Sequence, residues 1–197
     1  MLEFDEGPHE YRWDGKLVPS VTQILKPLSN LDNIPYGVLE NARVRGTAVH
    51  KACELYDYGQ LDESTLDPVL VPYLEAWKKF LHTKNLEVVL AEHLLYHPVK
   101  QYAGMIDRIL QHKKTGKKYL GDIKATYAQG PTVGPQTAGY LDAWNASCPD
   151  DKIRHRLSIR LKNDGSYDPD TDLKDRSDLV IFKGCLMIQN WRTKNYG

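Results

Sequence analysis

Cysteine is scarce in this chain, and its three copies, Cys53, Cys148 and Cys185, lie far apart. An odd number of widely spaced thiols does not form a disulfide framework. Three thiols are also too few for a four-cysteine zinc site or an iron–sulfur cluster. This cysteine usage indicates an intracellular, reducing compartment.

Net charge is also lacking, because 26 basic side chains balance 26 acidic ones. A polyanionic partner would therefore bind a local basic patch rather than a uniformly basic surface. No stretch approaches about 18 uninterrupted apolar residues, and no basic segment precedes an apolar one at the N-terminus, so we expect neither a membrane span nor a signal peptide.

Length and composition predict one α/β domain over residues 1–197. The chain is 41% apolar and 26% charged, which is ordinary for a globular protein that buries a substantial core. We divide it into an N-terminal hairpin and helix over residues 1–35 and a core over residues 36–197.

Turn, cap and apolar patterns predict the order of the elements. Asp14-Gly15 predicts a hairpin turn within residues 1–19, and Ser20 with Gln23 predicts a capped helix. Apolar spacing predicts helices over 36–58, 68–84, 136–144 and 172–191, and strands over 86–96, 105–111, 118–125 and 150–162. This order predicts a small mixed central β-sheet flanked by α-helices.

Two of these elements carry patterns that predict which side chains are exposed. In strand 150–162, Arg154, Arg156 and Arg160 share one face, which is either a phosphate track or the exposed face of an edge strand. In the last helix, the residues expected to face the core are Leu179, Val180, Phe182, Leu186 and Met187.

The stretch from Asp107 to Lys124 predicts a β-hairpin that carries charged groups. Asp122 and Lys124 point to the same side of their strand, because side chains alternate along it. A four-residue loop over 113–116 places Asp107 across from Asp122, whereas a two-residue loop over 115–116 places it across from Lys124. Either register gathers two carboxylates and one ammonium on one face.

Such a group has two interpretations. Two close carboxylates repel each other unless a cation lies between them, and their hard oxygen atoms suit Mg²⁺ or Mn²⁺. A lysine beside that ion can hold a nucleophilic water or steady a phosphate. Alternatively, Asp107, Asp122 and Lys124 form a solvated strand face without catalytic meaning.

Four motifs in series favour the catalytic interpretation. They are Arg45-Gly-Thr-Ala-Val-His50 with Glu54, Ala103-Gly-Met-Ile-Asp107-Arg108, Gly121-Asp-Ile-Lys124 and Gln136-Thr-Ala-Gly-Tyr140. Together they resemble the PD-(D/E)XK nuclease superfamily in its RecB-type exonuclease branch and span about half the chain. The segment Val18-Pro-Ser-Val-Thr-Gln-Ile-Leu25 is similar to stand-alone phage and mitochondrial genome-maintenance exonucleases of this branch.

Two features depart from the wider superfamily. Ile106, rather than proline, precedes the first aspartate, as is frequent in this branch. The chain also has no cysteine cluster, so the iron–sulfur subgroups are excluded and no such cluster is expected as a cofactor. The resemblance implies a restriction-endonuclease-like core over residues 36–197.

The resemblance also implies roles for individual residues. Asp107, Asp122, His50 and the backbone carbonyl of Ile123 would bind one or two Mg²⁺ or Mn²⁺ ions, with Glu92 as a supporting carboxylate. Lys124 would orient or deprotonate the attacking water. Gln136 and Tyr140 would contact DNA or brace the site, although Tyr140 also fits an ordinary core position. Residues that could grip phosphates are Arg43, Arg45 and Lys51. Glu54 lies one turn after His50, and this pair could be purely structural.

The expected function is a metal-dependent deoxyribonuclease that hydrolyses DNA from its ends in recombination, repair or replication. The alternatives are a structure- or site-specific endonuclease, an inactive DNA-binding recombination module, or a nuclease that acts on RNA. The expected partners are DNA, single-stranded or with ends, and a recombination or single-strand-binding protein, with no membrane. The resemblance implies the bacterial cytoplasm and a phage-encoded origin, while oligomeric state stays open.

Overall fold

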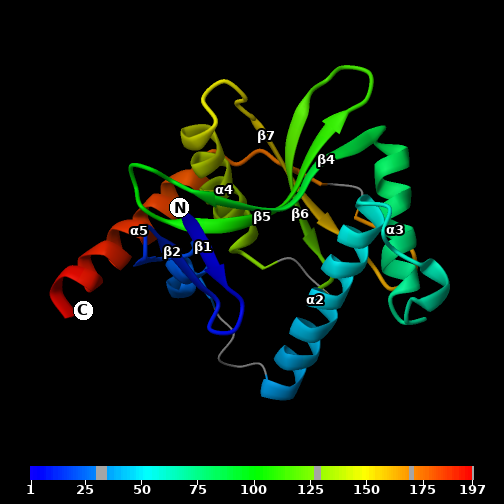
Figure 1. Ribbon diagram of the computed structural model, residues 1–197, viewed down its shortest axis with the longest axis horizontal. Coiled ribbons are helices and arrows are strands. Elements are labelled where there is room, and N and C mark those ends of the chain that lie inside the picture. The colour runs from blue at the N-terminus through cyan, green and yellow to red at the C-terminus, as the bar shows by residue number, and fades with distance from the viewer. Residues whose placement is uncertain (30–34, 127–129, 169–170, 197) are drawn as a thin grey trace.

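The computed structural model describes residues 1–29, 35–126, 130–168 and 171–196. Within them the chain has a mixed α/β fold that contains two sheets (Figure 1). The larger sheet has the strand order β4-β5-β6-β7-β8, and the smaller has the order β1-β2-β3. The expected mixed α/β architecture is therefore confirmed.

The five strands of the larger sheet are β4 (Leu86–Tyr96), β5 (Ala103–His112), β6 (Lys118–Lys124), β7 (His155–Arg160) and β8 (Asp172–Leu173). All neighbouring pairs are antiparallel except β6 and β7, which are parallel. The parallel pair requires a crossover, and helix α4 (Val133–Ser147) supplies it. The sheet is thus mixed, as predicted.

Helices cover the sheet through two apolar clusters. One cluster joins the sheet to α1 (Val21–Ile24), α4 and α5 (Ser177–Tyr196). The other joins it to α2 (Tyr36–Asp57) and α3 (Val71–Thr83), and Trp77 and Phe80 of α3 are fully buried there. Because both clusters draw on β5 and β6, these two strands lie at the centre of the core.

The N-terminal strands β1 (Leu2–Asp5), β2 (Glu10–Trp13) and β3 (Lys16–Val18) form the smaller sheet. Asp14 and Gly15 both have positive φ in the turn between β2 and β3, as the sequence predicts for a tight hairpin. Ser20 and Gln23 form the predicted capping box at α1. The predicted hairpin corresponds to β2 and β3, and β1 pairs with β2 as a third strand of this sheet.

Two expectations about exposure were wrong. Val180 and Met187 are 70% and 72% exposed, because α5 buries the stripe that contains Phe182, Cys185 and Leu186 instead. Strand β7 is flanked by β6 and β8 and is not an edge strand. Its Arg156 is buried and paired with Asp178 of α5 at 2.9 Å, so the arginines do not form one continuous exposed basic face.

Short 3₁₀ helices complete the described elements, at Lys26–Leu28 and Glu63–Thr65. In the described part of the chain, no helix has the length and apolar character needed to cross a membrane.

Candidate active site

The register of the central hairpin decides which groups meet at its centre. Arg108 pairs with Gly121 and Gln111 pairs with Lys118, and the amide of His112 donates to the carbonyl of Lys117 at 2.9 Å. The loop therefore has four residues, 113–116. Of the two registers that the sequence allows, the structure has the one in which Asp107 lies across from Asp122.

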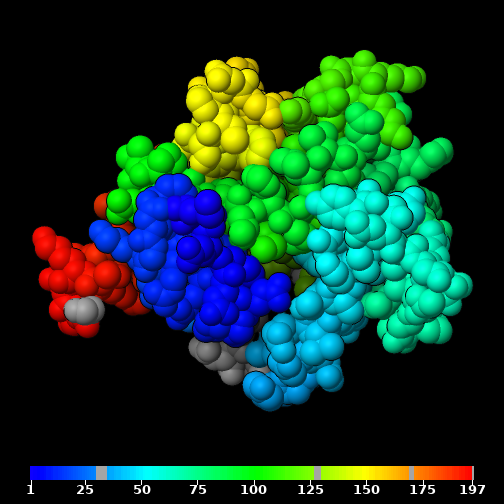
Figure 2. Space-filling model, viewed as in Figure 1, coloured from blue at the N-terminus to red at the C-terminus, as the bar shows by residue number. Residues whose placement is uncertain are grey.

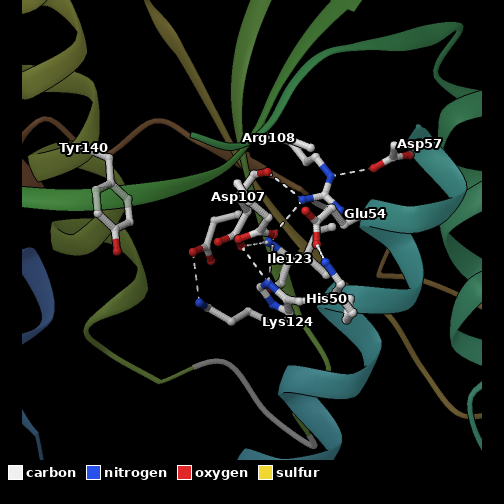
Figure 3. A network of polar contacts seen from close by, with 12 residues as sticks. His50, Glu54, Asp57, Asp107, Arg108, Ile123, Lys124 and Tyr140 are labelled. Carbon is white, nitrogen blue, oxygen red and sulfur yellow. Dashed lines mark hydrogen bonds and ion pairs between the residues drawn. The ribbon is translucent and has the colours of Figure 1, made fainter. Parts of the chain in front are cut away.

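The backbone N–H and C=O of Ile123 link Asp107 to His50 of α2 through two hydrogen bonds. The Ile123 amide donates to Asp107 Oδ2 at 2.7 Å, and His50 Nε2 lies 2.9 Å from the Ile123 carbonyl oxygen. A carbonyl oxygen only accepts, so Nε2 is the donor. His50 Nδ1 is then directed at two carboxylates. It lies 3.7 Å from Asp107 Oδ2 (Figure 3) and 3.7 Å from Glu92 Oε1.

Among the described residues, His50, Glu92 and Asp107 form a group that could hold a metal ion. One donor atom from each lies within 4.8 Å of the others, and they come from α2, β4 and β5. Two carboxylates and an imidazole nitrogen suit a divalent ion such as Mn²⁺, and carboxylates also suit Mg²⁺. The sequence predicted Glu92 only as a supporting carboxylate. In the structure it offers a donor atom to this group, as His50 and Asp107 do.

Asp122 and Lys124 lie beside this group on β6. Lys124 Nζ donates to Asp122 Oδ1 at 2.9 Å. Asp122 is 1% exposed, and its second carboxylate oxygen, Oδ2, has no hydrogen-bond partner among the described residues. A buried carboxylate oxygen without a partner is costly, and a bound cation would remove that cost. The donor set and this orphan oxygen thus fit a metal ion.

The ionisation of these groups follows from their burial and their neighbours. Burial lowers the pKa of His50, but Asp107 and Glu92 outweigh it and raise the pKa to about 9. Burial raises the pKa of Asp122 to about 6, against the opposing effect of Lys124. Burial lowers the pKa of Lys124, but Asp122 and Asp107 outweigh it, so the net pKa is raised. At neutral pH both His50 and Lys124 are therefore cations in the metal-free protein.

Metal-free protein is expected to lose stability as pH rises from 6.5 to 9. A raised folded-state pKa favours the folded state fully below the unfolded pKa of 6.5, and this contribution disappears as pH passes about 9. The loss is at most roughly 3 kcal/mol, because one pKa unit is worth about 1.4 kcal/mol. Urea unfolding with chelator at pH 6, 7.5 and 9 measures it.

His50→Gln should flatten this dependence, whereas His82→Gln, at an exposed position on α3, should retain it. The pKa of His93, His97 and His155 is lowered by burial, so these side chains complete their titration below the window. An unchanged slope in the His50→Gln protein would contradict the assignment.

Two buried charged residues, Arg108 and Asp57, support this site from its core side, and the sequence analysis gave neither of them a role. Arg108 is fully buried and donates to Asp57 Oδ2 at 2.6 Å and to Glu92 Oε1 at 2.7 Å. Asp57 lies at the end of α2. The sequence feature that could have identified Asp57 is its spacing of seven residues from His50, because this spacing places both residues on one helix face. Nothing in the sequence indicated that Arg108 would be buried.

Tyr140 is a core residue that also borders the site. It is 6% exposed, and Gln136 Nε2 donates to its hydroxyl at 3.3 Å, as the i, i+4 spacing predicts. Burial raises the pKa of Tyr140 well above its usual value, with Asp107 and Asp122 adding to the effect. The structure therefore places Tyr140 at a core position, while bracing of the site by Tyr140 and contact of Gln136 with DNA stay predictions.

Gly104 makes room for Tyr140, so Gly104→Ala is expected to destabilise the fold by about 1–3 kcal/mol. A Cβ at position 104 would lie 2.5 Å from Tyr140 Cε1, and the buried ring would have to move. The matched control is Gly184→Ala in α5, where an added Cβ meets nothing within 4 Å. Because alanine has a higher helix propensity than glycine, this variant should stabilise the fold slightly. Equal urea midpoints for the two variants would contradict this packing.

The remaining predicted residues of α2 do not converge on the donor group. Arg43 pairs with Glu40 at 2.6 Å, and Lys51 pairs with Glu54 at 2.7 Å. Arg45 Nε lies 3.4 Å from the carbonyl of Ala125, next to Lys124 in the chain. Glu54 is thus the partner of an exposed lysine. Phosphate binding by Arg43, Arg45 and Lys51 stays a prediction.

The surface is recessed between the N-terminal residues and α2, the helix that carries His50 (Figure 2).

Comparison with known proteins does not identify a family for this chain. No model of a protein family matches it, and no curated protein sequence matches it.

Proposed function

We propose that this protein is a Mg²⁺- or Mn²⁺-dependent deoxyribonuclease that hydrolyses phosphodiester bonds from DNA ends. The observation that carries the proposal is the convergence of His50, Glu92 and Asp107, with Asp122 and Lys124 beside them. These five residues come from one helix and three neighbouring strands, far apart in the sequence. A solvated strand face does not explain a carboxylate that is 1% exposed with an orphan oxygen.

His50 Nδ1, Glu92 and Asp107 would hold the ion, and the orphan oxygen of Asp122 is a further donor beside them. The Ile123 carbonyl accepts from His50 in this structure, and its predicted role as a metal ligand stays open. A bound ion would polarise the scissile phosphate and offset its charge.

Lys124 supplies a positive charge beside the reacting phosphate. Because its pKa is raised, its ammonium stays protonated at neutral pH and donates hydrogen bonds. This favours orientation of the attacking water and stabilisation of phosphate charge over deprotonation of that water. Asp122 holds the ammonium in place at 2.9 Å.

The mixed sheet with helices on both faces is compatible with a restriction-endonuclease-like core, and we propose this core together with the RecB-type exonuclease branch. The four motifs and their order support that placement. We further propose action in recombination, repair or replication, in a reducing cytoplasm, with a recombination or single-strand-binding protein as a second partner.

The test is a time course on end-labelled linear single- and double-stranded DNA and on covalently closed circular DNA, with Mn²⁺, Mg²⁺ or chelator. We expect linear DNA to be shortened from its ends with metal, circles to persist, and chelator to stop the reaction. Cutting of circles would instead identify an endonuclease.

Two other outcomes separate the remaining alternatives. DNA binding without hydrolysis at any metal concentration would indicate an inactive binding module. Digestion of RNA at least as fast as DNA would indicate a ribonuclease. Either result would overturn the proposed activity.

A further inference from the structure

Arg108 contacts two groups of the candidate metal site from within the core. Its side chain is 0% exposed, and its Nη1 donates to Glu92 Oε1 at 2.7 Å and to the Asp107 backbone carbonyl at 2.6 Å. The guanidinium thus contacts the side chain of one metal-ligand candidate and the backbone of another. A planar guanidinium is suited to this because its donors have fixed directions.

The guanidinium is itself held in place. Arg108 Nε donates to Asp57 Oδ2 at 2.6 Å, and the other Asp57 oxygen accepts from Trp77 Nε1 at 2.8 Å. The guanidinium carbon lies 5.8 Å from the centre of the Trp77 ring. Asp57 and Trp77 are buried side chains from two different helices, so Arg108 has little freedom to move. Figure 3 shows the contact between Arg108 and Asp57.

Glu92, by contrast, requires an external constraint. It lies within β4 with φ of 45°, a left-handed conformation that non-glycine residues rarely adopt. The paired residues on either side are Ala91 with Arg108 and His93 with Ile106. A strained residue at such a position persists when its surroundings hold it there. The hydrogen bond that Arg108 donates to the Glu92 carboxylate is a contact that can hold Glu92 in this conformation.

We propose that Arg108, fixed by Asp57, is a positioning residue that holds the Glu92 carboxylate against His50 and Asp107 and thereby sets the affinity of the site for Mg²⁺ or Mn²⁺. The inference rests on the proposed function, because it assigns a task within the same metal site. Arg108 does not touch the ion or the DNA and acts through Glu92.

The test is a calorimetric titration with MnCl₂ of four proteins: wild type, Arg108→Lys, Glu92→Ala and the double variant. Lysine keeps the charge but loses the fixed fork of donors. We expect Arg108→Lys to weaken Mn²⁺ binding about 10- to 100-fold, as is usual for groups that orient a metal ligand. In the Glu92→Ala background, which has no acceptor for Arg108 at position 92, the same change should alter affinity by no more than about twofold.

This cycle separates positioning from a merely structural role. If Arg108→Lys binds Mn²⁺ as tightly as wild type, or weakens it equally in both backgrounds, Arg108 does not act through Glu92 and the inference is overturned. The Mn²⁺ concentration for half-maximal DNA hydrolysis should rise in parallel with the dissociation constant.

Asp57→Asn provides a second route if Arg108→Lys fails to fold, as judged by circular dichroism. Asparagine keeps an acceptor for Trp77 but cannot pair with the guanidinium as an anion, so it should also weaken Mn²⁺ binding. Unchanged Mn²⁺ affinity in folded Asp57→Asn would overturn the inference. A wild-type protein that neither binds Mn²⁺ nor degrades DNA would instead overturn the proposed function.

Discussion

Replacement of Lys124 by alanine is expected to lower the rate of DNA hydrolysis by about 10²- to 10⁴-fold. The ammonium is held at 2.9 Å from Asp122 and is protonated at neutral pH, so its removal takes away a preorganised positive charge. Mn²⁺ binding should persist, because Lys124 is not a member of the group formed by His50, Glu92 and Asp107. Initial rates on end-labelled linear DNA at saturating Mn²⁺ measure the effect.

The matched control is Lys114→Ala in the loop between β5 and β6, where the lysine is exposed. This variant should hydrolyse DNA within about twofold of the wild-type rate, because exposed charges contribute little beyond a Debye length. If Lys124→Ala and wild type degrade DNA equally, the assignment of Lys124 is wrong. If both lysine variants lose activity alike, general attraction of DNA explains the loss instead.

Asp57→Ala is expected to destabilise the fold by about 3–5 kcal/mol, the usual cost of removing one partner of a buried ion pair. Asp57 accepts from Arg108 at 2.6 Å and from Trp77 at 2.8 Å, and its side chain is 1% exposed. The substitution would leave both donors without this acceptor in the core. The free energy of unfolding in urea, with chelator present, measures the loss.

Asp150→Ala is the matched control, since Asp150 is exposed before β7 and should change stability by no more than about 0.5 kcal/mol. Equal unfolding midpoints for the two variants would show that Arg108 finds sufficient compensation from Glu92 alone. Arg108 Nη2 argues against that outcome, because it has no hydrogen-bond partner among the described residues even in the wild type.

Local patterns were sufficient for most of the elements. Strand β4 has the predicted bounds, and α2 begins and ends within one residue of its prediction. Cap and turn chemistry was equally direct at Ser20 and at Asp14-Gly15. In each case the signal comes from neighbours in the sequence, where a side chain can contact only a few backbone groups.

Faces were predicted less well, because exposure depends on what packs against an element. Val180 and Met187 have the apolar character of core residues, yet α5 turns them outward. Arg156 has the character of a surface residue, yet β8 and α5 enclose it. Hydrophobicity alone does not say which side of an element a distant segment will cover.

The sequence by itself determined the order of most elements, the mixed α/β class and the set of residues that carry charge in the central hairpin, but it missed strand β8, which lies where a helix was predicted. The tertiary structure alone selected the register that places Asp107 across from Asp122, and it brought His50 and Glu92 to the same point. It also revealed Arg108 and Asp57 as buried partners. The physical reason is distance along the chain: these contacts join segments up to 73 residues apart, and only packing of the whole sheet and its helices fixes them.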